Sequence, residues 1–372
     1  MRNKMYIYIL PLLLAVMAAP QLYGQIIYDQ PGAGSVRMIY SHWKVESDGS
    51  ETTINQLAVP LTGFVPIRDN LEAQFYMANA SNKLKIIDSD TTLSGFSDFR
   101  IQVNKSMAED RVLLSGGINL PVGKKKLEPT GDRAVIDALS ADYLSFPIRR
   151  YGEGFGFNAM IGGATILGET RWGISMMYQY NGSYDPYEGG GSYDPGDLFG
   201  LSASFSKSFE KTAFSGDFIL TSFGEDKMGD EAVYDGSVQL DTRIKTALTE
   251  KKYDLRGNVR YLYRFEPVEI TIADFVPKTG RLYGNEFSLN GSFTYHPDNK
   301  WYVSPSVDLR FIGKSDEGID QSNIFGFGGT YGRALGEKMN MDVGLKYFTG
   351  SADDGALDLT GLQLTFGLTA IF

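Results

Sequence analysis

The chain has 372 residues, no cysteine and a formal net charge of −10. The lack of cysteine excludes disulfides and a lipid-modified cysteine anchor, and the acidic balance without a basic stripe argues against nucleic acid as a partner. Tyrosine (22), phenylalanine (23) and glycine (43) are abundant, and no stretch after the N-terminal one is apolar for long enough to form a membrane helix. In an exported chain, this composition is typical of a secreted β-protein or an outer-membrane barrel.

The N-terminus has the pattern of a secretory signal peptide. Two basic residues precede an apolar run over residues 5–19, and a proline and a small residue follow it, which is the usual order of the three regions. We predict a signal peptide over residues 1–24 with cleavage after Gly24, and Ala18 and Ala19 are alternative sites. An N-terminal membrane anchor is the other interpretation, for which this run is short.

Apolar and polar residues alternate with a period of two through most of the remaining chain. From Trp301 to Phe311, for example, every second residue is apolar or proline and the residues between them are mostly polar. Such runs mark strands with one apolar and one polar face. Their length of about ten to thirteen residues approaches the ~9–11 needed to cross a bilayer at a tilt. We predict strands over residues 35–47, 55–67, 71–81, 95–106, 112–122, 151–166, 172–182, 197–209, 213–222, 237–249, 252–264, 284–295, 301–312, 323–335, 339–349 and 358–372.

The predicted connections alternate between short and long. Tight polar turns such as 68–70 and 297–300 alternate with longer links such as 123–150. Short turns at one end and long loops at the other are expected of an outer-membrane barrel, periplasmic and extracellular respectively. The fold class is therefore an all-β transmembrane antiparallel up-and-down barrel of about sixteen strands. Fourteen is the fallback, because the first two strands have the weakest pattern.

A short periplasmic segment over residues 25–34 is expected to precede the barrel, which forms one domain over residues 35–372. A soluble secreted β-protein remains the third option, since it would also be exported and rich in strands.

Charged residues recur in the middle of the predicted strands, within the polar sets. A lysine or arginine facing lipid near the midplane costs ~2–4 kcal/mol, so we expect the polar sets to line a hydrated lumen. The candidate lumen-lining residues are Asp98, Arg100, Asp241, Arg243, Lys245, Arg256, Arg260, Asp308 and Arg310. They form either an anion-attracting stripe or, in the interpretation we favour, a salt-bridged wall that stiffens the barrel.

The cross-strand positions of four of these residues depend on one turn. If Glu250 and Lys251 form a two-residue turn, Asp241 lies opposite Arg260, and Lys245 lies opposite Arg256. The first pair would be an ion pair across the ladder, and the second a like-charge contact that needs another carboxylate or water.

Three short motifs resemble a known family of barrel transporters. Residues 94–104 followed by 112–123, which end in Leu-Pro-Val-Gly, are similar to the glycine–aspartate strand and "LPxG" strand end of the phenol meta-pathway outer-membrane transporters. Residues 57–72 resemble the opening hairpin of that family, and 193–201 its proline–glycine–aspartate segment before a later strand. The likeness covers about residues 55–210. It implies a barrel for passive uptake of small hydrophobic or aromatic compounds.

The related long-chain fatty-acid transporters carry a long N-terminal hatch inside the barrel, for which residues 25–34 are too short. The link at 123–150 offers a substitute, because residues 131–144 within it have the pattern of one short helix. Its apolar side comprises Val135, Ile136, Leu139 and Leu144. We hypothesise that this loop packs over or into the pore and narrows it, and the alternative is a helix on the outer rim.

No constellation for catalysis stands out. Of the two histidines, His42 lacks a positioned acid, and His296 falls in a predicted periplasmic turn, on the wrong side for a barrel protease. No phosphate-binding glycine loop or Cys/His metal set stands out. We expect no enzymatic activity, no catalytic or metal-binding residue and no cofactor. Acidic residues at 225–235 are interpreted as turn residues on a solvated rim, with Ca²⁺ ligation as the weaker alternative.

The last predicted strand ends on Phe372, which resembles the signal read by the barrel assembly machinery. We expect its apolar set, Leu362 to Phe372, to face lipid and the strand to pair with the first one. The expected location is the outer membrane, and the expected partners are the bilayer, lipopolysaccharide, the assembly machinery and a small-molecule solute. Passive transport of small molecules through a polar lumen is the favoured function, and a non-transporting structural, adhesive or secretion-complex barrel is the alternative.

Overall fold

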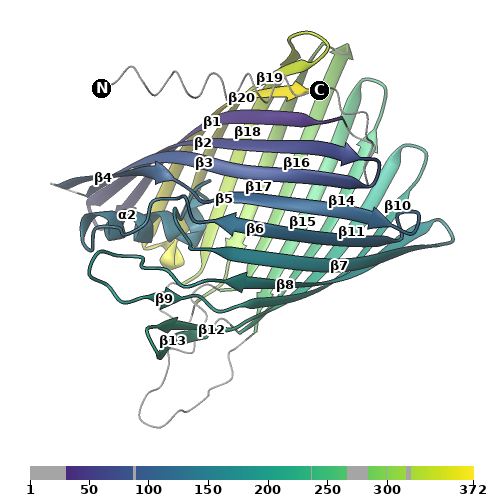
Figure 1. Cartoon of the computed structure of the whole chain (residues 1–372). Helices are drawn as coiled ribbons and strands as arrows, with labels where there is room; N and C mark the ends of the chain where they lie inside the picture. The colour runs from purple at the N-terminus through teal and green to yellow at the C-terminus, as the bar shows by residue number, and fades with distance from the viewer. Residues whose placement is uncertain (1–30, 87–88, 236, 266–283, 299, 316–319) are drawn as a thin grey trace.

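A computed structural model shows a closed antiparallel β-barrel (Figure 1). It describes residues 31–86, 89–235, 237–265, 284–298, 300–315 and 320–372. The predicted signal peptide, most of the 25–34 segment and the predicted link at 266–283 lie outside the described residues. The described part of the chain contains no helix that is long and apolar enough to cross a membrane.

Sixteen strands form the barrel, as the sequence predicted, and the fourteen-strand fallback is wrong. Each strand pairs with the barrel strands before and after it, and β1 also pairs with β20, which closes the ladder. The strands are β1 (Ala33–Ser47), β2 (Ser50–Arg68), β3 (Leu71–Ile86), β4 (Ser89–Phe96) continued by β5 (Phe99–Met107), β6 (Val112–Leu120), β7 (Gly156–Leu167), β8 (Thr170–Asn181), β10 (Leu198–Ser208), β11 (Thr212–Phe223), β14 (Val238–Thr249), β15 (Tyr253–Arg264), β16 (Glu286–Asp298), β17 (Trp301–Ile312), β18 (Ser322–Ala334), β19 (Met339–Ala352) and β20 (Leu357–Ile371).

One of the sixteen strands is interrupted. β4 and β5 pair with successive parts of β3, and Ser97 and Asp98 lie between them outside either strand. The backbone N–H of Ser97 still donates to Ala78 on β3 (2.8 Å), but that of Asp98 donates to the carbonyl of Tyr151 (3.1 Å). At the break, the segment around Tyr151 therefore takes the place of a strand partner for Asp98.

Side chains alternate between the two faces of the barrel wall. On β20, Leu364 and Phe366 are 45% and 39% exposed, whereas Gln363 donates to Ser41 across the closing seam. Outward apolar side chains recur on the other strands, among them Met38, Ile161, Ile174, Leu201, Phe218, Leu255, Phe293, Phe311, Phe327 and Leu345. Lipid covers such a continuous apolar belt on a closed barrel. The chain is therefore an integral outer-membrane protein.

The two ends of the barrel differ in their connections. At one end every turn between barrel strands has two to four residues, which is typical of the periplasmic end. At the other end, which we call the long-loop end, longer links include 121–155, 182–197 and 224–237. The links at 182–197 and 224–237 contribute a small sheet that the sequence did not predict, of β9 (Tyr193–Asp194), β12 (Glu225–Met228) and β13 (Glu231–Asp235). In Figure 1 this sheet and α2 lie at the same end of the barrel.

The alternation of short and long connections is less strict than the sequence indicated. At the long-loop end, β1 and β2 are joined by a two-residue turn of Asp48 and Gly49, with φ of 43° and 81°. Positive φ at both residues is the type I′ geometry that suits a tight hairpin. The predicted start of the second strand at residue 55 is therefore wrong, because β2 begins at Ser50. Its first residues are polar on both faces, so the alternation used for prediction is absent there.

Candidate functional site

The link between β6 and β7, residues 121–155, enters the mouth of the barrel, and we call it the inner loop. It carries α2 (Gly131–Ser140) and the 3₁₀ turn η1 (Asp142–Leu144). The prediction of one continuous helix over 131–144 is wrong, because Ala141 has φ −55° and ψ 116° and separates α2 from η1. The predicted strand 151–166 also begins later, at Gly156, since residues 151–155 belong to the inner loop.

The apolar side of α2 and η1 packs against the inner wall of the barrel. Val135, Leu139 and Leu144 are at most 1% exposed. They belong to one buried cluster with inward side chains of β1–β4 and of β17–β20, namely Trp43, Ile54, Ala58, Ala78, Ala80, Leu84, Leu93, Ile312, Ile324, Ala352 and Leu359. The inner loop thus lies inside the barrel and not on its outer rim.

Asp98 fixes both ends of the inner loop. One carboxylate oxygen accepts the backbone N–H of Gly123 (2.8 Å), and the other accepts the backbone N–H of Glu153 (2.7 Å) and the side-chain amide of Asn119 (2.9 Å). A Cβ atom on Gly123 would lie 2.8 Å from the Asp98 carboxylate and from the Tyr151 carbonyl. Glycine is therefore required where the loop leaves β6.

A buried amide holds the middle of the inner loop. The Gln56 side chain on β2 accepts the backbone N–H of Ile148 (3.0 Å) and donates to the Ile148 carbonyl (2.6 Å). Gln56 has no exposed surface. The amide therefore imitates a strand partner for one residue of the loop, and both of the main-chain polar groups of Ile148 are satisfied.

Asp142 in the inner loop binds basic residues of the opposite wall. Its carboxylate lies 3.4 Å from Arg264 on β15 and 3.5 Å from Arg310 on β17. Arg310 also donates to the Asp142 carbonyl (2.5 Å) and to the Ser145 hydroxyl (2.6 Å). Because β15 lies seven strands from β4–β5 around the ladder, the loop reaches nearly across the lumen.

The charged residues of β14–β17 are connected by ion pairs. Asp241 binds Arg243 (2.6 Å) and Arg260 (2.9 Å), and Glu286 binds Arg310 (3.0 Å) and Arg260 (3.5 Å). Four more of the predicted residues form ion pairs: Arg100 with Glu153 (2.5 Å), Lys245 with Asp217 (3.1 Å), Asp308 with Lys346 (2.6 Å) and Arg256 with Asp254 (3.7 Å).

The predicted register between β14 and β15 is wrong by two residues. The turn consists of Lys251 and Lys252, since Glu250 donates to Tyr253 across it. Arg243, and not Asp241, lies opposite Arg260. The expected ion pair still forms on the diagonal between Asp241 and Arg260, but the like-charge contact of Lys245 and Arg256 does not, because Asn258 faces Lys245.

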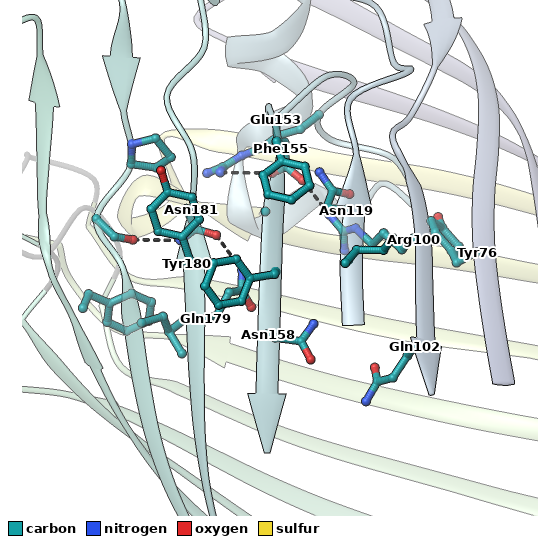
Figure 2. Close-up of a pocket in the computed structure, with 18 of the residues that line it drawn as sticks. Tyr76, Arg100, Gln102, Asn119, Glu153, Phe155, Asn158, Gln179, Tyr180 and Asn181 are labelled. Atoms are coloured by element: carbon teal, nitrogen blue, oxygen red, sulfur yellow. Dashed lines mark hydrogen bonds and ion pairs between the residues drawn. The ribbon is translucent and has the colours of Figure 1, made fainter. Parts of the chain in front are cut away.

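A cavity of about 1430 Å³ runs along the lumen beside the inner loop. It is lined near the periplasmic end by Ser35 and Gln74, and at the long-loop end by Tyr184 and Tyr234. Its wall is rich in uncharged amides, five of which Figure 2 labels around the cavity: Gln102, Asn119, Asn158, Gln179 and Asn181. Arg100, Glu153 and Arg150 form its charged edge against the loop.

Aromatic side chains surround the mouth of the cavity. The rings of Tyr184 and Tyr193 meet edge to face with centroids 5.7 Å apart. Asp226 on β12 accepts hydrogen bonds from the Tyr193 hydroxyl (2.5 Å) and from the Gly196 backbone (2.8 Å). Burial raises the pKa of Tyr184 to about 12 and also raises the pKa of Tyr193. Both phenols are therefore neutral at physiological pH.

Sequence reasoning missed the residues that place the inner loop. Gln56, Asp142 and Glu153 were not singled out, because the partners that tie them to another part of the barrel are more than fifty residues away along the chain. The usable signal is a polar residue such as Gln56 on the inward set of a strand whose neighbouring positions, Ile54 and Ala58, are apolar. Such an exception indicates that a polar segment must pack there.

No protein-family model matches the chain, and no curated protein matches it. Solved structures with a similar outline include the CymD monoaromatic hydrocarbon channel (TM-score 0.47, 11% identity, 96% of this chain and 92% of that chain). OccAB4 of Acinetobacter baumannii gives a TM-score of 0.46 with 8% identity over 95% and 100% of the two chains. OprD of Pseudomonas aeruginosa gives 0.46 with 11% identity over 91% and 94%. The assignment as an outer-membrane β-barrel rests on the closed strand ladder and its apolar belt.

Proposed function

We propose that the protein allows passive transport of small molecules across the outer membrane, through the cavity beside its inner loop. The observation that carries this proposal is the extent of the cavity, whose wall includes Ser35 near one end of the barrel and Tyr184 beyond the other. The inner loop reduces the free cross-section of the lumen and leaves open the side formed by β5–β8, β10, β11, β14 and β15.

The nine charged residues singled out by their sequence pattern are proposed to be a salt-bridged wall of this lumen and not an anion-attracting stripe. Their pairing supports this interpretation, since each of them lies within hydrogen-bond or ion-pair distance of a complementary group. Exposed pairs add only ~0–1 kcal/mol each to stability. Of the nine residues only Arg100 lines the cavity itself, so the main effect of the pairs is to brace the rest of the lumen wall.

The family resemblance implies small hydrophobic or aromatic compounds as solutes, and from it we retain only the finer proposal that the solute has an apolar face. Phe155, Tyr184 and Phe265 on the cavity wall support a solute with at least one apolar face. We further propose cleavage of a signal peptide at residues 1–24 and contact of the outer rim with lipopolysaccharide. We also propose that the protein is not an enzyme, since the described lumen residues suggest no set of reacting groups.

Reconstitution tests the proposal directly. The purified barrel in planar bilayers is expected to show discrete conductance steps. Replacing residues 128–146 by a short Gly-Ser link should raise the conductance, because it removes α2 and η1 from the lumen. A correctly folded barrel without conductance or solute flux, in both forms, would instead support the structural, adhesive or secretion-complex role.

A further inference from the structure

We propose that the cavity beside the inner loop selects uncharged solutes with several hydroxyl groups, of the monosaccharide or small oligosaccharide class. This inference rests on the proposed transport function and names its solute. It follows from three properties of the cavity wall: the density of side-chain amides, the neutralisation of its charges and the aromatic rings at its mouth.

The side-chain amides on the cavity wall retain donors and acceptors that are available to a solute. Gln179 donates to Asn181 (2.7 Å) and Gln102 donates to Ser115 (2.6 Å), which leaves their carbonyl oxygens without a hydrogen bond from the described residues. Within the described part of the chain, the Asn158 amide has no hydrogen-bond partner. Since a carboxamide offers both donors and acceptors, it matches a hydroxyl group, which also does both.

The charged groups that reach the cavity are already bound to other groups of the protein. Arg100 and Arg150 share the carboxylate of Glu153, at 2.5 and 3.5 Å. Arg264 is paired with Asp142 (3.4 Å), and Asp226 accepts hydrogen bonds from Tyr193 and Gly196 of the neighbouring 182–197 link. An ionic solute would lose hydration in this passage and would have to compete with these existing bonds for a charged partner, which disfavours its transfer. A neutral polar solute does not meet this penalty.

Rings at the mouth and along the wall supply the apolar component. Tyr184 and Tyr193 form an edge-to-face pair at the mouth, and in Figure 2 Phe155 lies on the same side of the cavity as Tyr180 and Asn181. Sugar rings carry C–H groups on their faces and hydroxyls at their edges, so they can stack on aromatic rings while bonding to amides. A purely apolar solute would displace water from these amides without replacing its hydrogen bonds, which is costly.

The test is a swelling assay on proteoliposomes that contain the full-length barrel. The probes are glucose and arabinose, with gluconate and glucosamine as charged solutes of similar size and phenol as an apolar aromatic. We expect the neutral sugars to enter several-fold faster than both charged solutes. Gln179→Leu combined with Asn158→Leu should reduce sugar entry several-fold and leave the conductance for KCl nearly unchanged.

Gln363→Leu is the matched control, because Gln363 is an amide on β20 that donates to Ser41 and does not line the cavity. It should leave sugar entry unchanged. Asn158→Leu alone is the second variant, in case the double variant does not fold. If no probe enters and no conductance appears, transport itself is refuted. If charged solutes or phenol enter as fast as sugars, or if the leucine variants leave sugar entry intact, transport stands and the proposed selectivity is refuted.

Discussion

The carboxylate of Asp98 accepts the backbone N–H of Glu153 at 2.7 Å, and Arg100, two residues further on, binds the Glu153 carboxylate at 2.5 Å. Glu153 of the inner loop is therefore held through its main chain by Asp98, at the strand break, and through its side chain by Arg100 on β5. This double attachment places Glu153 at the edge of the cavity. Because Asp98 at the strand break holds the loop in this position, it helps to set the width of the open passage.

Asp98→Ala is expected to release the inner loop. It removes three accepted hydrogen bonds, and bonds to a charged group contribute about 1.5–3 kcal/mol each. Single-channel recording should show larger and noisier conductance than the wild type, and limited proteolysis should cut within residues 121–155. Asp217→Ala, which removes only the partner of Lys245 on the wall, should leave the loop protected. Equal protection of the Asp98→Ala loop would contradict the anchoring role.

Gln56→Leu is expected to loosen the middle of the same loop. The substitution keeps a similar volume but leaves the N–H and C=O of Ile148 buried without partners, at about 1–3 kcal/mol for each group. Hydrogen exchange at Ile148 should become faster, while the ladder amides of β2 stay protected. Gln56→Glu provides a second readout, since it retains one acceptor for the Ile148 N–H. Unchanged exchange in Gln56→Leu would show that the apolar contacts alone hold the loop.

Asp241→Asn is expected to make the lumen more selective for anions. Asp241 is the carboxylate that binds both Arg243 and Arg260, so its neutralisation leaves excess positive charge on β14 and β15. The reversal potential in a KCl gradient should shift toward that of chloride. Asp358→Asn changes the net charge equally at an exposed position on β20 and should produce no shift. The same potential in both variants would indicate that this wall does not face the conducting path.

Deleting Phe372 is expected to impair assembly more than pore properties. Its N–H donates to Gly32 (2.8 Å) next to the closing seam, and its ring packs against the same residue. The fraction of the protein that migrates as a folded barrel on an unheated gel should fall, while barrels that do fold keep wild-type conductance. Phe372→Tyr keeps the ring and should restore assembly. Normal assembly of the truncated chain would refute the role as an assembly signal.

The barrel could be predicted from the sequence because contact with lipid requires an alternating pattern of apolar and polar residues. Within the bilayer each outward position must be apolar, so period-two alternation marks the strands and their number. That constraint ends at the membrane surface, and the start of β2 at Ser50 was accordingly missed. The break between β4 and β5 was also missed, because Asp98 fits the polar set of an uninterrupted strand.

The interior of the lumen was less predictable than its wall. A two-residue shift keeps every side chain on its face, so alternation could not decide between the two registers of β14 and β15. The apolar side of α2 was readable from Val135 and Leu139, but its docking surface on β1–β4 and β17–β20 was not. Those contacts join residues far apart in the chain, and only the closed barrel brings them together.

The pairing of β1 with β20 also determines when folding can be completed. Fourteen residue pairs, from Ala33 with Ile371 to Glu46 with Asp358, join segments that lie more than three hundred residues apart in the chain. Until that pairing forms, both strands expose unbonded edges, which favour aggregation, and such distant pairing is slow to form. We therefore expect the chain to need a periplasmic chaperone until the barrel closes. The unpaired edges of β1 and β20 are the surfaces that we expect such a chaperone to cover.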